Sequence, residues 1–139
     1  LCIPSTLIYI LIEIFNKKVK SWCTGISRYL KAIRSPILHN PNIDVNNNTV
    51  EIGHCYGRNF WNKGYGTEAL TRIIKFFFEE VEVETIYAYY VDGNSVSGKV
   101  LEKVGMKYEG NLRKRVYDKV TKKQVDLISY SITRDDYFK

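Results

Sequence analysis

The stretch Trp61–Ala69, WNKGYGTEA, places two glycines directly ahead of a long apolar segment. The residues Thr67–Val81, TEALTRIIKFFFEEV, repeat apolar side chains at the spacing of one helix face, which predicts an amphipathic helix. A helix N-terminus offers backbone N–H groups to an anion, and glycine lets a ligand approach because it carries no side chain. The stretch therefore predicts either an anion-binding turn, with Lys63 adding charge, or an ordinary strand-to-helix turn.

Two widespread phosphate motifs do not fit these glycines. A Walker loop needs lysine and then a hydroxyl residue after its last glycine, whereas Thr67 follows Gly66 directly and Lys63 precedes both glycines. A dinucleotide fingerprint permits Ala69 at its third glycine position, but no acidic residue ends a second strand at the expected distance. The remaining interpretation is a pyrophosphate held by bare backbone amides around Gly64 and Gly66.

The composition indicates one packed domain with a basic surface. The chain has 139 residues, of which 45% are hydrophobic, a length and content that support a single core. Its net charge is +6, yet the basic residues are spread along the sequence, with only short clusters at Lys17–Lys20 and Arg113–Arg115. This distribution favours a solvated basic surface over a nucleic-acid footprint, so no nucleic-acid partner is expected.

Cysteine, histidine and the N-terminal residues exclude several other classes. Three cysteines without a C-x-x-C pair, and only two histidines, argue against a disulfide framework or a metal site and suit the reducing cytoplasm. The apolar run Leu1–Phe15 contains Glu13 and is shorter than the roughly 20 residues that a membrane span needs, so no membrane association is expected. Because the chain begins at Leu1 rather than methionine, we expect a truncated or processed product.

The order of predicted elements indicates an α/β domain with a mixed sheet. Residues 1–48 show no convincing strand or helix pattern, so the domain core is expected to span residues 49–139. Gly53 lies inside a predicted strand and suggests a bulge. The predicted elements are, in chain order, a hairpin loop Asn40–Asn48, strand Thr49–Tyr56, helix Thr67–Val81, strand Thr85–Val91, helix Asn94–Gly105, and two long strands within Met106–Ile132 joined near Thr121–Lys123.

Two motifs in the right order resemble the GNAT acetyltransferase superfamily. They are VEIGHCYGRNFWNKGYGTEAL, residues 50–70, and NSVSGKVLEKVGMKYEG, residues 94–110, followed by DLISYSI as a closing strand. The likeness covers roughly residues 49–137 and is greatest to the Rim-type branch, the ribosomal-protein N-terminal acetyltransferases and their relatives. The resemblance implies an α/β (α+β) fold with a mixed, mostly antiparallel sheet, a splayed central strand pair and flanking helices.

The resemblance also implies a site for acetyl-CoA, without a metal. In this superfamily the pantetheine arm lies beside the splayed strand, which corresponds to Glu51–Tyr56. Asn94 corresponds to the asparagine that binds the pantetheine chain, and it also suits the N-cap of the following helix. Trp61 replaces the usual glutamine or arginine, so one phosphate contact is expected to be missing. The expected cofactor-binding residues are Cys55, Tyr56, Lys63, Gly64, Tyr65, Gly66, Thr67 and Asn94.

The catalytic residues follow from the same resemblance. Leu101 stands where many members have the tyrosine that protonates the leaving thiolate, so Ser97 is the candidate acid, unless its hydroxyl belongs only to the capping turn. Glu51 corresponds to a glutamate used as the base, and its alternative is a solvated carboxylate at a strand edge. His54 is a second candidate base, although a packed histidine suits that position better. The tyrosines Tyr56, Tyr89 and Tyr117 are expected to line the core or the cleft.

The implied reaction is direct transfer of an acetyl group to a primary amine. The leading acceptor is a protein N-terminal α-amine, and the second is a small-molecule amine such as a polyamine or an aminoglycoside. Family members carry a first strand and two helices that line the acceptor cleft, and residues 1–48 do not show them convincingly. A non-catalytic acyl-CoA-binding remnant is therefore the alternative. A cytoplasmic monomer or homodimer is expected.

Overall fold

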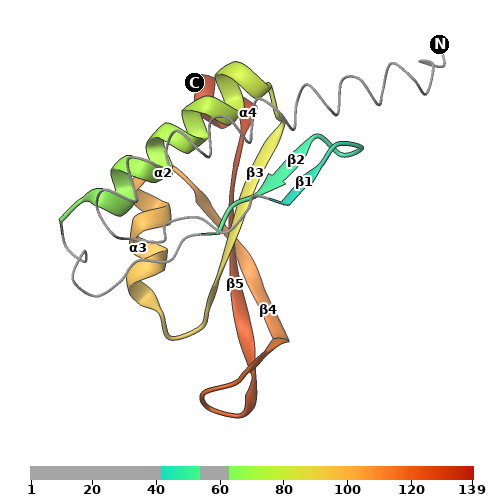
Figure 1. Cartoon of the computed structure of the whole chain (residues 1–139), viewed down its shortest axis with the longest axis vertical. Helices are drawn as coiled ribbons and strands as arrows, with labels where there is room; N and C mark the ends of the chain where they lie inside the picture. Colours follow the sequence, from blue (N-terminus) through green and yellow to red (C-terminus); the bar gives the residue numbers. More distant parts are fainter. Residues whose placement is uncertain (1–41, 54–62) are drawn as a thin grey trace.

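The protein is described here by a computed structural model covering residues 42–53 and 63–139. Its centre is a five-stranded sheet in the order β1-β2-β3-β5-β4, with helices on one side (Figure 1). The elements are β1 Asn42–Asp44, β2 Thr49–Glu51, α2 Tyr65–Phe76, the π-helical turn η2 Phe77–Val81, β3 Thr85–Val91, α3 Ser95–Lys103, β4 Lys107–Asp118, β5 Lys123–Thr133 and α4 Arg134–Phe138.

The sheet combines one parallel strand pair with three antiparallel pairs. β2 and β3 are parallel, with Glu51 opposite Tyr87, whereas β1–β2, β3–β5 and β4–β5 are antiparallel. The predicted mixed, mostly antiparallel fold is therefore confirmed. α2 and η2 lead from the end of β2 back to the start of β3, and α3 follows the end of β3, so both helix N-termini lie at the same end of the parallel pair (Figure 1).

The hydrophobic core lies between the helices and one face of the sheet. Alternation along β3 directs Ile86 and Ala88 into this core, where both are fully buried. α2 contributes Leu70 and Ile73 from the face that the sequence periodicity predicts. The core residues are Val50, Ile52, Leu70, Ile73, Ile74, Phe76, Phe77, Phe78, Val83, Ile86, Ala88, Leu101, Met106, Tyr130 and Ile132.

The predicted helix Thr67–Val81 changes its winding at Phe77. The wider turn η2 ends at Glu82, whose φ of 62° is left-handed, and Val83 N–H donates to the Phe77 carbonyl at 3.1 Å. Three consecutive rings, Phe76, Phe77 and Phe78, are buried across this change of winding. The Arg134 guanidinium Nη1 donates to the Phe78 carbonyl at 2.7 Å, so α4 satisfies a backbone acceptor at the turn.

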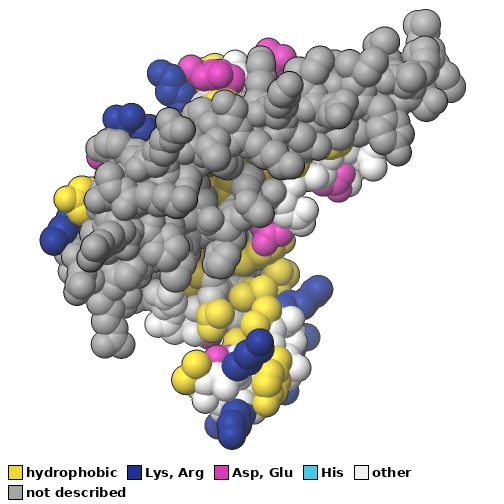
Figure 2. Space-filling view, in the orientation of Figure 1, with side chains coloured by type: hydrophobic (Ala, Val, Ile, Leu, Met, Phe, Trp, Pro, Cys, Tyr) yellow, Lys and Arg dark blue, Asp and Glu magenta, His cyan; other side chains and the backbone are white. Residues whose placement is uncertain are grey.

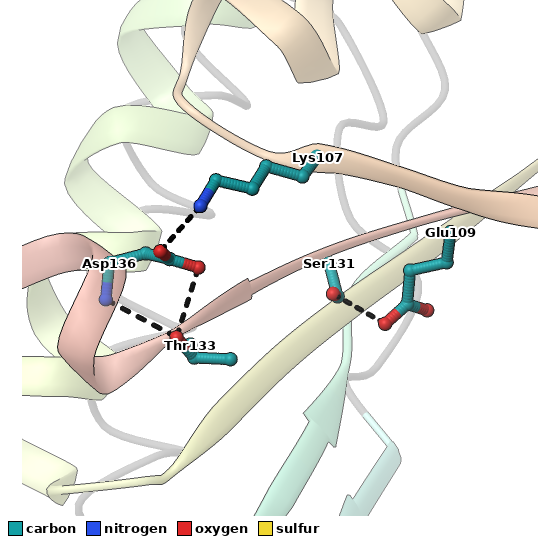
Figure 3. A network of polar contacts seen from close by, with 5 residues as sticks. All are labelled: Lys107, Glu109, Ser131, Thr133 and Asp136. Atoms are coloured by element: carbon teal, nitrogen blue, oxygen red, sulfur yellow. Dashed lines mark hydrogen bonds and ion pairs between the residues drawn. The ribbon is translucent and has the colours of Figure 1, made fainter.

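A polar network joins α4 to the edge of the sheet (Figure 3). Lys107 Nζ of β4 lies 2.6 Å from Asp136 Oδ1 of α4. The Thr133 hydroxyl donates to Asp136 Oδ2 at 3.0 Å and accepts from the Asp136 N–H at 3.2 Å, which caps α4. The hydrogen bond from Lys107, followed by that from Thr133, holds the pKa of Asp136 below its ordinary value.

The loop predicted over Asn40–Asn48 is wrong in its centre. Asn42–Asp44 form strand β1, which pairs with β2, so the sheet extends into the segment expected to be irregular. Asp44 Oδ1 accepts the N–H groups of Asn46 and Asn47 at 3.0 and 3.1 Å, and Asn48 has a φ of 53°. The asparagines therefore form a short turn, as their chemistry predicts, but one that follows a strand.

Candidate active site

Gly64 begins α2 with an open, left-handed turn. Its φ is 79°, a region that favours glycine, and its carbonyl accepts the Glu68 N–H at 3.0 Å. A Cβ added to Gly64 would meet no heavy atom of residues 42–53 and 63–139 within 4 Å, so this part of the chain leaves space beside the turn. Gly64 has no side chain to cap the helix, and Lys63 is exposed next to it. The turn therefore suits an anion, because the first turn of a helix presents N–H groups and a positive dipole end.

Asn94 stands at the N-cap of α3, but its side chain makes no capping hydrogen bond. The turn is closed by backbone contacts instead, with Asn94 N–H donating to the Val91 carbonyl and Ser97 N–H donating to the Asn94 carbonyl, both at 3.1 Å. Asn94 therefore lies at the start of this helix, as predicted, but its exposed carboxamide does not cap the helix. It is available to a ligand at the same end of the parallel pair as Gly64.

Ser97 lies one helical turn beyond Asn94 and is half-buried. Leu101, one turn further on, is fully buried in the core. The residue that aligns with the tyrosine of the resemblance therefore packs in the core of this chain. Among the residues of α3 that follow Asn94 on this face, Ser97 supplies the hydroxyl closest to the helix start.

A close contact with β3 fixes the position of α3. A Cβ added to Gly98 would lie 2.7 Å from the Tyr90 hydroxyl oxygen and 3.0 Å from Tyr90 Cζ. Glycine inside a helix costs about 1 kcal/mol relative to alanine. Here the absence of a side chain lets the helix pack closely against the Tyr90 ring, which explains a glycine at this position.

Glu51 is half-buried at the end of β2, beside tyrosines of β3. The main chain continues the pairing for one more bond, from Ile52 N–H to the Tyr87 carbonyl at 2.9 Å. Burial raises the pKa of Tyr87 and of Tyr89, and the Glu51 carboxylate adds to both increases. Glu51 therefore acts electrostatically on the sheet face opposite α2 and α3, where these tyrosines alternate with the core residues of β3.

A second carboxylate, which the sequence did not identify, lies on that same face. Glu109 of β4 accepts hydrogen bonds from the Ser129 hydroxyl at 3.0 Å and from the Ser131 hydroxyl at 2.6 Å, the latter drawn in Figure 3. Both serines are buried. The Glu109 carboxylate also raises the pKa of Tyr89, after burial and Glu51. Polar serines alternating with apolar residues in β5 are the sequence pattern that could have indicated this polar face.

Several expected residues lie outside the part of the chain that the structure describes. Cys55 and Tyr56, the expected cofactor contacts of the splayed strand, belong to residues 54–62, as do His54 and Trp61. Within residues 42–53 and 63–139, no three His, Cys, Asp or Glu side chains gather as metal ligands, and no helix is long and apolar enough to cross a membrane.

The family is established by comparison with known proteins. The model of the acetyltransferase (GNAT) domain matches residues 37–107, and the chain belongs to this family. A curated relative, the uncharacterized N-acetyltransferase p20 of Bacillus licheniformis, is 33% identical over 95 residues, which are 68% of this chain and 52% of the relative. The chain thus spans about half the length of this relative.

Solved structures agree with the fold. The ribosomal-protein-S5-alanine acetyltransferase of Vibrio fischeri is 27% identical with a TM-score of 0.63, over 69% of this chain and 52% of that one. The microcin C7 self-immunity acetyltransferase MccE, solved in complex with acetyl-CoA and AMP, is 26% identical with a TM-score of 0.59, over 66% and 49% of the two chains. The predicted GNAT fold is confirmed, whereas the Rim-type branch stays a prediction.

Proposed function

We propose that this chain binds acetyl-CoA at the end of the parallel pair β2–β3 and transfers its acetyl group to a primary amine. The observation that carries the proposal is the turn at Gly64, which is left-handed, uncapped by its own side chain and open to a ligand. Family membership and the acetyl-CoA complex of the related MccE support this choice of ligand.

The expected contacts of acetyl-CoA fit this end of the sheet. The first-turn amides of α2, with Lys63, are proposed to bind the pyrophosphate, and the Asn94 carboxamide is proposed to bind the pantetheine chain. When bound, acetyl-CoA supplies an acyl group that its thioester bond activates. The N-terminal turns of α2 and α3 would hold it from the helix side of the sheet, so the acceptor is proposed to approach from the face of Glu51.

Two side chains are proposed to move the protons of the reaction. Glu51 would accept, directly or through a water, the proton that the acceptor ammonium loses before its nitrogen forms the new bond to the acyl carbon. Ser97 would donate a proton to the sulfur as its bond to that carbon breaks, and it would regain a proton, directly or through a water, from the nitrogen, which loses its second proton as the amide forms. No acyl group is attached to the protein at any step, so the reaction needs no nucleophilic side chain.

A protein N-terminal α-amine is the proposed acceptor. The name of the related ribosomal-protein-S5-alanine acetyltransferase supports this class. The face that carries Glu51 and Glu109 is acidic and lined by Tyr87 and Tyr89, which suits a cationic amine. A small-molecule amine satisfies the same chemistry, and the acceptor panel described below separates the two.

The binding step is tested with a matched pair of glycine variants. Gly64→Ala and Gly105→Ala both put a side chain on a residue with positive φ, 79° and 89°, so their backbone penalties are similar. Coenzyme A at 100 times its Kd should stabilise the native chain and Gly105→Ala by about 2.7 kcal/mol in thermal unfolding. Gly64→Ala should lose most of this stabilisation. Equal stabilisation of both variants would refute the assignment of the turn.

The transfer step is tested by thiol release from acetyl-CoA. The native chain is incubated with N-terminal peptides, spermidine and an aminoglycoside, and free coenzyme A is measured. Preferential turnover of peptides would support the proposed acceptor, and preferential turnover of the small amines would replace it. Stabilisation by coenzyme A without turnover of any acceptor would instead identify a non-catalytic acyl-CoA-binding chain.

A further inference from the structure

The hairpin of β4 and β5 projects from the rest of the domain and is strongly basic. It extends past the start of α3, away from the other strands (Figure 1), and basic side chains surround its tip (Figure 2). We call residues 111–126 the basic hairpin. Its six basic residues, all exposed, are Arg113, Lys114, Arg115, Lys119, Lys122 and Lys123.

Beside residues 1–41, which hold six basic residues and one acidic residue, the basic hairpin is the other strongly basic stretch of the chain. It contains six basic and two acidic residues, a net charge of +4 within a chain whose net charge is +6. The two clusters lie at different heights of the same hairpin: Arg113–Arg115 in the bulge of β4, and Lys119–Lys123 at the turn from β4 to β5. The fold thus places six of the chain's 21 basic residues on one projecting hairpin, which the sequence order alone does not reveal.

Both acidic residues of the basic hairpin are occupied by its own turns. Asp118 accepts the N–H groups of Val120 and Thr121 at 3.0 and 3.2 Å, and the Thr121 hydroxyl at 2.6 Å. Asp126 accepts the Lys114 N–H at 2.8 Å. Within residues 42–53 and 63–139, none of the six basic side chains of the hairpin forms an ion pair. The basic hairpin therefore keeps a net charge of +4 that can attract an external polyanion.

Three of the cations project from a bulge that Asp126 holds in place. The β4–β5 register shifts between Leu112 and Val116, and Lys114 has a φ of 50°. The bulge lines an open concavity of about 520 Å³ with Asn111, Leu112, Arg113, Lys114 and Arg115. The hydrogen bond from the Lys114 N–H to Asp126 restrains the main chain of the bulge, so less backbone freedom is lost when a ligand binds.

The basic hairpin also has an aromatic side chain among its charges. Tyr117 is 54% exposed and follows the bulge on β4, opposite Gln124. An acidic protein segment would match the charge but would not explain an exposed ring between two cationic clusters. In a single-stranded nucleic acid, phosphates contact the cations while an unpaired base stacks on the ring.

We propose that the basic hairpin binds a single-stranded nucleic acid, with its cations on the phosphates and Tyr117 stacked on a base. The proposal concerns binding alone and does not depend on acetyl transfer. Six phosphate contacts would give a slope of about −4 when log Kobs is plotted against log salt concentration. Affinity in the range of non-specific binding, roughly micromolar to 100 micromolar at physiological salt, is expected.

The test measures fluorescence anisotropy of labelled single-stranded RNA and DNA oligonucleotides over a range of KCl concentrations. R113Q/K114Q/R115Q should reduce the magnitude of the slope by about 2, because three charges are removed. The control R72Q/K75Q/K139Q changes the net charge equally, but it removes cations of α2 and the C-terminal residue. Its slope should equal that of the native chain. Equal losses in both variants would overturn the proposal, because net charge alone would then explain binding.

Two further measurements address the identity of the partner. Tyr117→Leu should weaken binding of the single strand several-fold while leaving the salt slope unchanged, as expected for a stacking contact. An unchanged affinity would overturn the stacking assignment. Competition by poly-glutamate as strong as that by the oligonucleotide, on a charge basis, would overturn the choice of nucleic acid and identify an acidic protein surface instead.

Discussion

The two faces of the sheet differ although the same strands form both. On the helix side, Ile86 and Ala88 of β3 lie fully buried in an apolar core. On the opposite side, their neighbours Tyr87 and Tyr89 lie near the carboxylates of Glu51 and Glu109. Because side chains of a strand alternate between faces, one face can be used for stability and the other for chemistry. Substitutions on the two faces should accordingly affect different properties.

The largest effect on stability is expected from the helix side. Phe77→Ala removes a fully buried ring from η2, and the lost contacts and the resulting cavity should lower the free energy of unfolding by about 3–5 kcal/mol. Urea unfolding followed by circular dichroism measures this difference. A loss below about 1 kcal/mol would show that η2 is not part of the cooperative core, and the contrast between the faces would fail.

The matching experiment on the opposite face is Glu51→Gln. If Glu51 is the base, as proposed, this change should lower kcat by roughly 100-fold or more, since general acid–base catalysis contributes about 10²–10⁴-fold. The carboxamide is nearly isosteric, so the urea midpoint should stay close to that of the native chain. Steady-state thiol release and unfolding are measured on the same preparation. Unchanged kcat with reduced stability would assign Glu51 to the fold instead.

The helix-side face was largely predictable from the sequence. α2 was identified from its apolar period, and Gly64 and Asn94 were placed at helix starts because glycine and asparagine have local conformational preferences. The closing hairpin β4–β5 followed from two long strand-forming runs. These features depend on residues close together in the chain, which is why a sequence pattern reveals them.

The polar face was much less predictable. The hydrogen bonds from Ser129 and Ser131 to Glu109 depend on the β4–β5 register. That register includes a bulge between Tyr108 and Gly110, which the sequence pattern does not predict. Strand β1 was missed because its asparagine and aspartate residues are typical of turns, and pairing with β2 overrides that preference. The basic hairpin likewise exists only once two strands pair.

The fit between α3 and β3 gives a smaller, sign-changing prediction. Gly98→Ala gains about 1 kcal/mol of helix propensity but forces a methyl group against the Tyr90 ring, at a cost of about 1–3 kcal/mol. We therefore expect net destabilisation of about 1 kcal/mol in the native background. In Tyr90→Leu, where the ring is absent, the same change should stabilise the chain. A double-mutant cycle by urea unfolding measures the coupling, and additive effects would contradict the contact.

The smallest effect on stability is expected where Lys107 of the edge strand β4 pairs with Asp136 of α4. Hydrogen bonds from Lys107 and Thr133 lower the pKa of Asp136 in the folded chain below its ordinary value of 3.8. The folded state therefore binds that proton less readily than the unfolded state. The resulting stability is present above the unfolded pKa and is lost as the pH falls through the folded pKa. Asp136→Asn should lower the melting temperature slightly at neutral pH.

The difference in melting temperature between the native chain and Asp136→Asn should shrink as the pH falls from about 5 toward 3, since protonation removes the same charge from the native carboxylate. Raising the salt concentration at neutral pH should shrink it too, because the Lys107 side chain is exposed and dissolved ions screen its charge. Lys107→Gln serves as the partner control and should reduce the pH dependence by less, because the hydrogen bond from Thr133 to the Asp136 carboxylate remains. A difference that persists unchanged below pH 3 would show that the Asp136 carboxylate acts through packing or capping geometry, with no contribution from its charge.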